Sequence, residues 1–339
     1  MLESDRRWGR WFVWSLAGLV LASLFAAIVL GPITVPFRDA VISLVAPQDE
    51  SLSAVHRVIV RQIRAPRALL GLLVGSALAV SGVAMQGLFR NPLASPYVLG
   101  VASGASTGAA LAILFASGTA LFLPIGAFAG AAAAVLIVYS LARGRDRRTS
   151  IFTLILAGVA VGALFSAVTS FLIFLSSGGE RLSDVLFWIM GGLGRASWNS
   201  VSILAPIALL GITAVLFAAR DLNALSLGEE GAYHVGVNPD ALYRWLLGVT
   251  TVLTATAVAM AGTIGFIGLV IPHVMRLLVG PDHRRLIPAS ALAGGCFLVW
   301  ADIGARTVLA PAELPVGVIT AFLGAPFFLY LLKTRGARL

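Results

Sequence analysis

Charged residues are scarce in this sequence of 339 residues. Asp, Glu, Lys and Arg make up 12% of it, hydrophobic residues make up 59%, and the mean hydropathy is +0.96. A water-soluble domain carries about 25% charged residues, so this chain lacks the polar surface that such a domain needs. The stretches 68–89, 91–142 and 149–179 contain no charged residue. Because a membrane-spanning helix needs about 20 apolar residues, these stretches predict helices that cross a membrane.

Lysine and cysteine each occur only once. The one lysine, Lys333, stands in Leu-Leu-Lys-Thr, so the phosphate-binding motif G-x-x-x-x-G-K-[ST] is absent. The chain therefore does not hold nucleotide phosphates in that way. The one cysteine, Cys296, lies within an apolar run, which excludes an intrachain disulfide and a cysteine-based metal site. We expect it to be a small buried residue.

Acidic residues are missing from the middle of the apolar stretches, because Asp302 and Glu313 fall at their ends. A proton-coupled carrier normally needs acids at membrane depth, and an intramembrane enzyme needs a catalytic pair there. The four histidines show no spacing typical of a metal site. We therefore expect no catalytic residue, no metal and no cofactor, and a pore or carrier without an energy source of its own.

Ten apolar stretches predict an all-α, polytopic membrane protein with ten membrane-spanning helices in a single domain, residues 1–339. The first stretch has a basic flank but is longer than the apolar part of a signal peptide, so we interpret it as a membrane-spanning helix. The eighth is short and contains Pro272. The predicted spans are 11–31, 68–89, 93–115, 119–142, 150–176, 198–219, 242–262, 264–279, 286–304 and 315–332.

The net charge of +9 comes from arginines between the apolar stretches. An even number of spans places both termini on the same side of the membrane. With the N-terminus in the cytoplasm, the cytoplasmic side carries twice as many Lys and Arg residues as the outside, most clearly at 143–148. Cytoplasmic loops are rich in these residues, so we predict cytoplasmic termini. The orientation of the chain in the membrane explains its excess of Arg and Lys better than nucleic-acid binding does.

Glycines recur every third or fourth residue within several predicted spans. In lipid, such faces allow helices to approach closely, so we interpret them as packing faces, with the lining of a pathway as the alternative. The repeats are Gly71 and Gly75, then Gly100, Gly104 and Gly108, then Gly262, Gly265 and Gly268.

Two segments outside the predicted spans stand out. The segment at about 221–240 is polar and cytoplasmic, and Leu222, Leu225, Ala232 and Val235 fall on one face if it is helical. The segment at about 177–198 is rich in glycine and aromatic residues. We expect it to form a short helix outside the membrane.

Several motifs follow one another along the chain. They are Arg64-Ala-Pro-Arg67, Gly82-Val-Ala-Met-Gln86-Gly-Leu-Phe-Arg-Asn91-Pro, Gly228-Glu-Glu, Gly265-Phe-Ile-Gly-Leu-Val-Ile-Pro-His273, Ala301-Asp302 and Leu314-Pro-Val-Gly317. Together they resemble the FecCD/BtuC family of permeases, which import ferric siderophores, heme and cobalamin. The resemblance covers about the whole chain.

The resemblance implies a type II ATP-binding-cassette importer of the inner (plasma) membrane with the BtuC-like fold. Such a permease works as a homodimer in lipid with two ATPase subunits and a periplasmic or lipid-anchored substrate-binding protein, and it binds no nucleic acid. A ferric siderophore is the favoured substrate. Cobalamin or heme is the alternative, because Met190-Gly-Gly192-Leu is a variant also found in cobalamin permeases. A secondary carrier without an ATPase is the rival function.

The resemblance also implies roles for particular residues. Those expected to transmit the motion of the ATPase are Leu225, Gly228, Glu229, Glu230, Ala232 and Gly236. Those expected to bind the substrate-binding protein, as exposed charges, are Arg64, Arg67 and Arg306. Those expected in the translocation path or its gate are Thr149, Ser150, Gln86 and Asn91. The fifth and tenth spans are expected to line the passage.

The residues themselves leave simpler interpretations open. Gln86 within an apolar span is typical of a residue that hydrogen-bonds a neighbouring helix, and the Asn-Pro pair at 91–92 is typical of a helix end. Glu229 and Glu230 are compatible with a solvated surface. The arginines are compatible with contacts to lipid headgroups or to the chain's own acids, such as Asp302.

Overall fold

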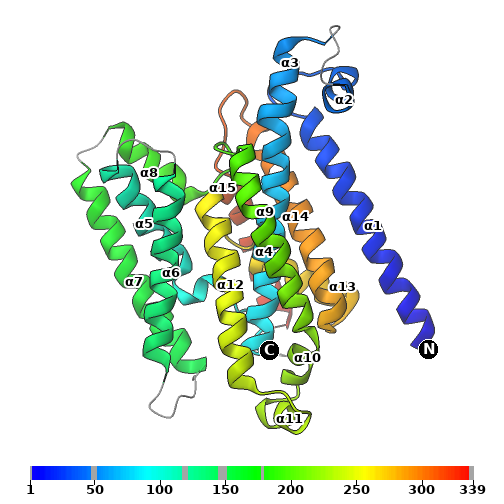
Figure 1. Ribbon diagram of the computed structural model, residues 1–339, viewed down its shortest axis with the longest axis vertical. Coiled ribbons are helices and arrows are strands. Elements are labelled where there is room, and N and C mark those ends of the chain that lie inside the picture. Colours follow the sequence, from blue (N-terminus) through cyan, green and yellow to red (C-terminus); the bar gives the residue numbers. More distant parts are fainter. Residues whose placement is uncertain (1, 47–51, 117–120, 144–150, 177–178, 336–339) are drawn as a thin grey trace.

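The computed structural model describes residues 2–46, 52–116, 121–143, 151–176 and 179–335, and the regular structure in these ranges is helical (Figure 1). The long helices are α1 (Leu2–Val29), α4 (Ala65–Leu88), α5 (Val101–Phe115), α6 (Phe122–Ala142), α7 (Ile151–Leu175), α9 (Trp198–Phe217), α12 (Pro239–Ala261), α13 (Ile267–Val279), α14 (His283–Thr307) and α15 (Val316–Arg335). The short ones are α2 (Phe37–Val45), α3 (Ala54–Val58), α8 (Glu180–Met190), α10 (Ala219–Leu225) and α11 (Glu229–His234). The chain is thus all-α, as the sequence predicts.

Each of the ten predicted spans coincides over most of its length with one helix of the structure. Six helices of the described ranges are long and apolar enough to cross a membrane, and four shorter apolar helices match the remaining predicted spans. The predicted start of the third span at 93 is wrong, because Arg90 adopts a left-handed φ of 48° and a 3-10 turn over Pro96–Leu99 precedes α5. A proline-rich stretch favours such a turn over a continuous helix.

Helix α4 forms the centre of the bundle (Figure 1). Nearly all of its residues between Leu70 and Leu88 are buried, and it packs against α9, α12, α13 and α14. Helices α5 to α8 form a group on one side of α4, and α1 lies on the other side against α14. The bundle therefore has two ends, which we call the α3 end and the α11 end after the short helices found there.

Glycines bring these helices into backbone contact. A Cβ atom on Gly82 would overlap the carbonyl group of Gly268, and one on Gly75 would overlap that of Gly294. The same holds between α5 and α6, where Gly104 faces Gly130. In a membrane such close approach stabilises helix pairs through dispersion, so Gly75 and Gly104 pack helices as predicted. The predicted place of Gly100 on the same helix face is wrong, because it precedes α5 with a φ of 76°.

The predicted face at Gly262, Gly265 and Gly268 is wrong. Gly262 ends α12 with a φ of 70°, Gly265 lies in the following loop, and only Gly268 belongs to α13. Left-handed φ values are readily adopted only by glycine, so a regular spacing here reflects a turn rather than a helix face.

Replacing Gly82 by alanine is expected to lower the free energy of unfolding by about 1–3 kcal/mol, because α4 and α13 would have to move apart to make room for the Cβ atom. The control is Gly248→Ala on α12, where a Cβ meets no atom within 4 Å and alanine is expected to stabilise the helix by about 0.5–1 kcal/mol. Thermal unfolding of the purified variants measures the difference. Equal midpoints for the two variants would contradict this packing.

Candidate functional site

The segment predicted at 221–240 forms the two short helices α10 and α11, which lie at the α11 end (Figure 1). Gly228 separates them with a φ of 99°, a value that strains other residues. Leu222, Leu225 and Ala232 are fully buried, as one shared face requires. The placement of Val235 on that face is wrong, since it follows the end of α11 and is 60% exposed.

Glu229 connects this segment to α12. The Tyr243 hydroxyl, which belongs to a side chain only 2% exposed, donates to Glu229 Oε1 at 3.0 Å. Glu229 and Glu230 are both exposed, but no hydrogen bond or ion pair engages the Glu230 side chain within the described ranges. The two neighbouring acids therefore differ: Glu229 holds α11 onto the bundle, whereas Glu230 matches the solvated surface.

Asn223 connects the same segment to α14. Its Nδ2 donates to Asp282 Oδ1 at 2.7 Å, and its Oδ1 accepts from the backbone N–H of His283 at 3.0 Å. The Nδ1 atom of His283 lies 2.7 Å from the same Asn223 oxygen. The residues on either side of the Gly228 joint are thus fastened to two different long helices.

Asp282 is the N-cap of α14, and its Oδ1 accepts from the backbone N–H of Arg284 at 3.1 Å. Burial raises the pKa of this carboxyl, but the hydrogen bonds from Asn223 and Arg284 and the charges of Arg284 and Arg285 outweigh burial and lower the pKa. The charged form is therefore favoured at neutral pH. An aspartate before a helix is a recognisable cap, but its bond to Asn223 depends on tertiary packing.

Gln86 and Asn91, predicted in the translocation path, line one cleft at the end of α4. Gln86 is 3% exposed, donates to the Leu269 carbonyl at 3.1 Å, and accepts from Arg276 Nη1 at 2.9 Å. It is therefore an interhelical hydrogen-bonding residue, as the simpler interpretation holds. The Asn91 side chain accepts from the Leu93 N–H at 2.8 Å and shapes the turn after α4. Thr149 and Ser150 lie outside the described residues.

Arg67 is the centre of an ionic network near the α3 end. Its guanidinium donates to both carboxylate oxygens of Asp302 at 3.0 and 3.1 Å and to both of Glu313 at 3.1 and 3.0 Å. The Nε atom of Arg306 lies 3.4 Å from Oδ2 of the same Asp302. The Asp302 side chain is 3% exposed and that of Glu313 is 43% exposed. The network joins α4, α14 and the loop before α15.

Arg64 and Arg306 bind the end of α1. Arg64 donates to the carbonyls of Ile28 and Val29 at 2.9 and 2.7 Å, and Arg306 donates to that of Ala27 at 2.6 Å. The last carbonyls of a helix have no partner within it, and cations are favoured there by the helix dipole. These two arginines therefore complete the hydrogen bonding of α1.

The expectation that Arg64, Arg67 and Arg306 are exposed charges is wrong. Their exposed fractions are 3%, 6% and 3%, because carboxylates and helix-end carbonyls of the same chain surround them. For Arg67 and Arg306 the structure thus matches the alternative in which the arginines contact the chain's own acids, whereas Arg64 binds backbone carbonyls. Their role in docking stays a prediction.

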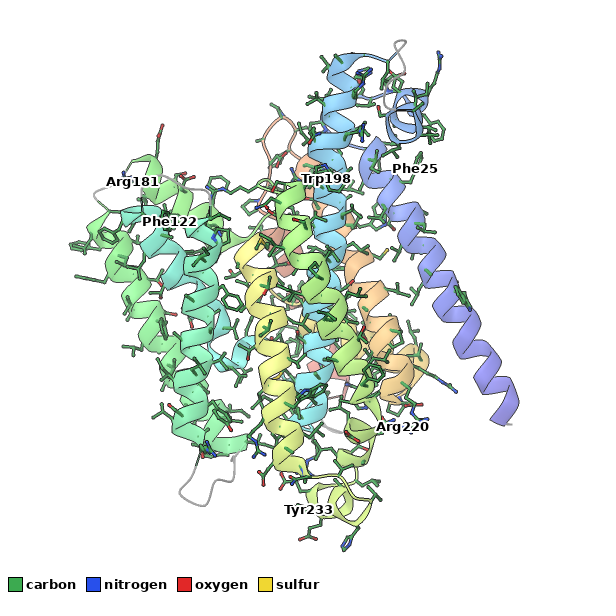
Figure 2. The ribbon with its side chains drawn as sticks, viewed as in Figure 1. Phe25, Phe122, Arg181, Trp198, Arg220 and Tyr233 are labelled. Atoms are coloured by element: carbon green, nitrogen blue, oxygen red, sulfur yellow. The ribbon has the colours of Figure 1, made fainter. Side chains whose placement is uncertain are left out.

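Labelled side chains mark the opposite ends of the bundle (Figure 2). Figure 2 places Arg220 and Tyr233 toward the α11 end and Arg181 and Trp198 toward the other. The predicted short helix at 177–198 is α8, which packs against α5. Arg181 of α8 donates to the Leu114 carbonyl at 2.9 Å, and Trp198 donates to the Arg61 carbonyl at 2.9 Å.

Comparison with known proteins identifies the family. Residues 19–334 match the model of the FecCD transport family. The chain is 46% identical to the cobalamin import system permease protein BtuC of Halobacterium salinarum, over 89% of this chain and 81% of that protein. It is 44% identical to the hemin transport system permease protein HmuU of Yersinia pestis, over 80% and 81% of the two chains. It is 41% identical to the Fe(3+) dicitrate transport system permease protein FecD of Escherichia coli, over 94% and 95%.

A solved structure has the same fold. It is described as an inward-facing conformation of an ABC transporter assigned to the metal-chelate type. The superposition gives a TM-score of 0.84 at 33% identity and covers 95% of this chain and 98% of that one. The chain therefore belongs to the FecCD transport family, the multi-pass membrane permease subunits of ABC importers.

Proposed function

We propose that this chain carries a metal chelate across the inner (plasma) membrane as one half of a homodimer. Two copies of a separate ATPase subunit drive it, and a periplasmic or lipid-anchored protein delivers the chelate. The observation that carries the proposal is the pair α10 and α11, which projects at one end of the bundle and is bonded to α12 and α14. Such a pair is suited to pass motion from a bound ATPase to the long helices.

The proposal includes ten membrane spans with both termini in the cytoplasm and with α11 on the cytoplasmic side. Three large apolar side chains of the α10–α11 region, Leu227, Tyr233 and Val235, are 69%, 59% and 60% exposed. Exposed apolar groups outside the membrane are typical of a protein interface. In a Cys296→Ala background, a cysteine at Glu230 is expected to react with a membrane-impermeant reagent only from the cytoplasm.

The proposed docking face for the substrate-binding protein is the α3 end. Because Arg64, Arg67 and Arg306 are buried there, we assign them the task of holding the surface loops in place. Arg67 binds Glu313, which is half-exposed in the loop between α14 and α15. The arginine network therefore fixes the position of the Glu313 carboxylate, which is accessible to a partner at the surface.

A ferric siderophore remains the favoured substrate, and cobalamin and heme are the alternatives. The relatives' names include cobalamin, hemin and Fe(3+) dicitrate, which supports a chelate without choosing among the three classes. The passage is assigned to α7 and α15, the fifth and tenth spans. Both helices expose large apolar side chains, such as Phe174 at 81% and Phe322 at 74%.

Reconstitution in proteoliposomes tests the function. With the ATPase subunit, the binding protein and ATP, uptake is expected for one class among a ferric siderophore, cyanocobalamin and hemin. The chain alone is expected to hydrolyse no ATP and to transport none of them, because it has no phosphate-binding loop. Transport by the chain alone would show a secondary carrier instead.

A further inference from the structure

A cleft of about 580 Å³, lined by charged and polar side chains as well as apolar groups, lies at the α11 end, between the end of α4, helix α10 and the start of α14. Its volume is within the range that holds whole small-molecule ligands, about 300–1,000 Å³, so it is larger than one inorganic anion requires. The side chains that matter here are Gln86, Arg90, Asn223, Arg276, Asp282 and His283.

Arg276 is half-buried in this cleft without an acidic partner. Its Nη1 donates to the neutral amide oxygen of Gln86 at 2.9 Å, and no carboxylate of the described residues forms an ion pair with it. Asp282 also lines the cleft, but its Oδ1 is already bonded to Asn223 and to the Arg284 backbone. The contrast is Arg67, which binds two carboxylates. Partial burial of a cation has a cost that an anionic partner offsets, so Arg276 is suited to bind an incoming anion.

A second arginine and an unpaired imidazole nitrogen line the same cleft. Arg90 is exposed, and a Cβ on Gly228 would lie 3.6 Å from its Nη1, so its guanidinium lies beside the joint between α10 and α11. The Nε2 atom of His283, a residue only 6% exposed, has no hydrogen-bond partner in the described part of the chain. The cleft therefore offers an incoming anion the guanidinium groups of Arg276 and Arg90, with the imidazole of His283 beside them.

We propose that this cleft receives an acidic side chain of the ATPase subunit, whose carboxylate binds Arg276 and Arg90. The inference rests on the proposed function, because the ATPase is the partner assigned to the α11 end. The cleft is continuous with the α10–α11 pair, since α10 forms one of its walls. Guanidinium–carboxylate pairs are among the strongest polar contacts and are geometrically specific. A single carboxylate here would tie the ATPase to α4 and α13 as well as to the α10–α11 pair.

Binding of the ATPase subunit to the permease in lipid nanodiscs tests the proposal. Arg276→Gln is expected to weaken binding at least about tenfold, and Arg276→Lys is expected to restore part of it. Arg90→Gln, at an exposed position where folding is not at risk, is expected to weaken it in the same direction. The matched control is Arg284→Gln, an exposed arginine of the same end that does not line the cleft, and it is expected to bind like the wild type.

Unchanged binding of both Arg276→Gln and Arg90→Gln, with the wild type binding normally, would overturn the inference and leave the proposed function intact. Failure of the wild-type chain to bind any ATPase would instead overturn the proposed function. A photo-crosslinking residue at Ser226, on the rim of the cleft, is expected to capture an ATPase peptide that contains Asp or Glu. Citrate or phosphate that stabilises the isolated permease through Arg276, without such a crosslink, would show a site for free anions and overturn the partner assignment.

Discussion

Replacing Asp302 by alanine is expected to destabilise the chain by about 3–5 kcal/mol, the usual cost of breaking a buried ion pair by removing one partner. Asp302 accepts two hydrogen bonds from Arg67 and lies 3.4 Å from Arg306, and its side chain is 3% exposed. Without it, Arg306 keeps only backbone carbonyl contacts and Arg67 keeps only Glu313. The guanidinium groups of Arg67 and Arg306 would then have only the Glu313 carboxylate to balance their charges.

The matched control is Asp184→Ala, which removes a pair between Asp184 and Arg195 that is 3.1 Å long but about half-exposed. Exposed pairs contribute about 0–1 kcal/mol. Chemical unfolding of both variants in the same detergent measures the two changes. Equal losses for the two variants would mean that the Arg67–Asp302 pair is solvated in the folded protein, contrary to its burial.

The helices were predictable because the membrane imposes a simple requirement on the sequence. A span needs about 20 apolar residues, and each such stretch contains a helix in the structure. The error at the third span arose where Pro92 and Pro96 interrupt an otherwise apolar run. Hydropathy alone reports such a run as one helix, whereas proline geometry divides it.

The burial of the arginines could not be predicted from their positions along the chain. Arginine is rarely buried unless it is paired, and the pairs here form between residues far apart in sequence, such as Arg67 and Asp302. A single sequence names the acids but does not show which helix faces meet. The bond between Asn223 and Asp282 was missed for the same reason.

For the α10–α11 pair, the position and polarity of the segment were predictable from the sequence, but the different contacts of its two acids were not. Glu229 and Glu230 are adjacent, identical in type and both at the start of α11. Only the packing of α11 on α12 places Tyr243 beside one of them. This difference makes the two acids a matched pair for testing how motion passes through the segment.

Glu229→Arg is expected to reduce ATP-driven uptake about 10- to 150-fold while the ATPase subunit still binds. The substitution removes the acceptor of the Tyr243 hydroxyl, and hydrogen bonds to charged groups are worth about 1.5–3 kcal/mol. It also adds a cation near Arg90, which lies beside Gly228. With α11 released from α12, movement of the ATPase reaches the bundle only through the bonds of α10 to α14.

Glu230→Arg is the control, because it makes the same change of charge on the same helix at a side chain with no bond to α12. Tyr243→Phe removes the hydrogen bond without changing charge and is expected to lower uptake in the same direction as Glu229→Arg. Uptake and ATP hydrolysis measured together in proteoliposomes separate loss of coupling from loss of ATPase binding, since an uncoupled complex still hydrolyses ATP. Equal losses in Glu229→Arg and Glu230→Arg, with Tyr243→Phe unaffected, would assign the effect to surface charge and reject the bond between α11 and α12 as the link.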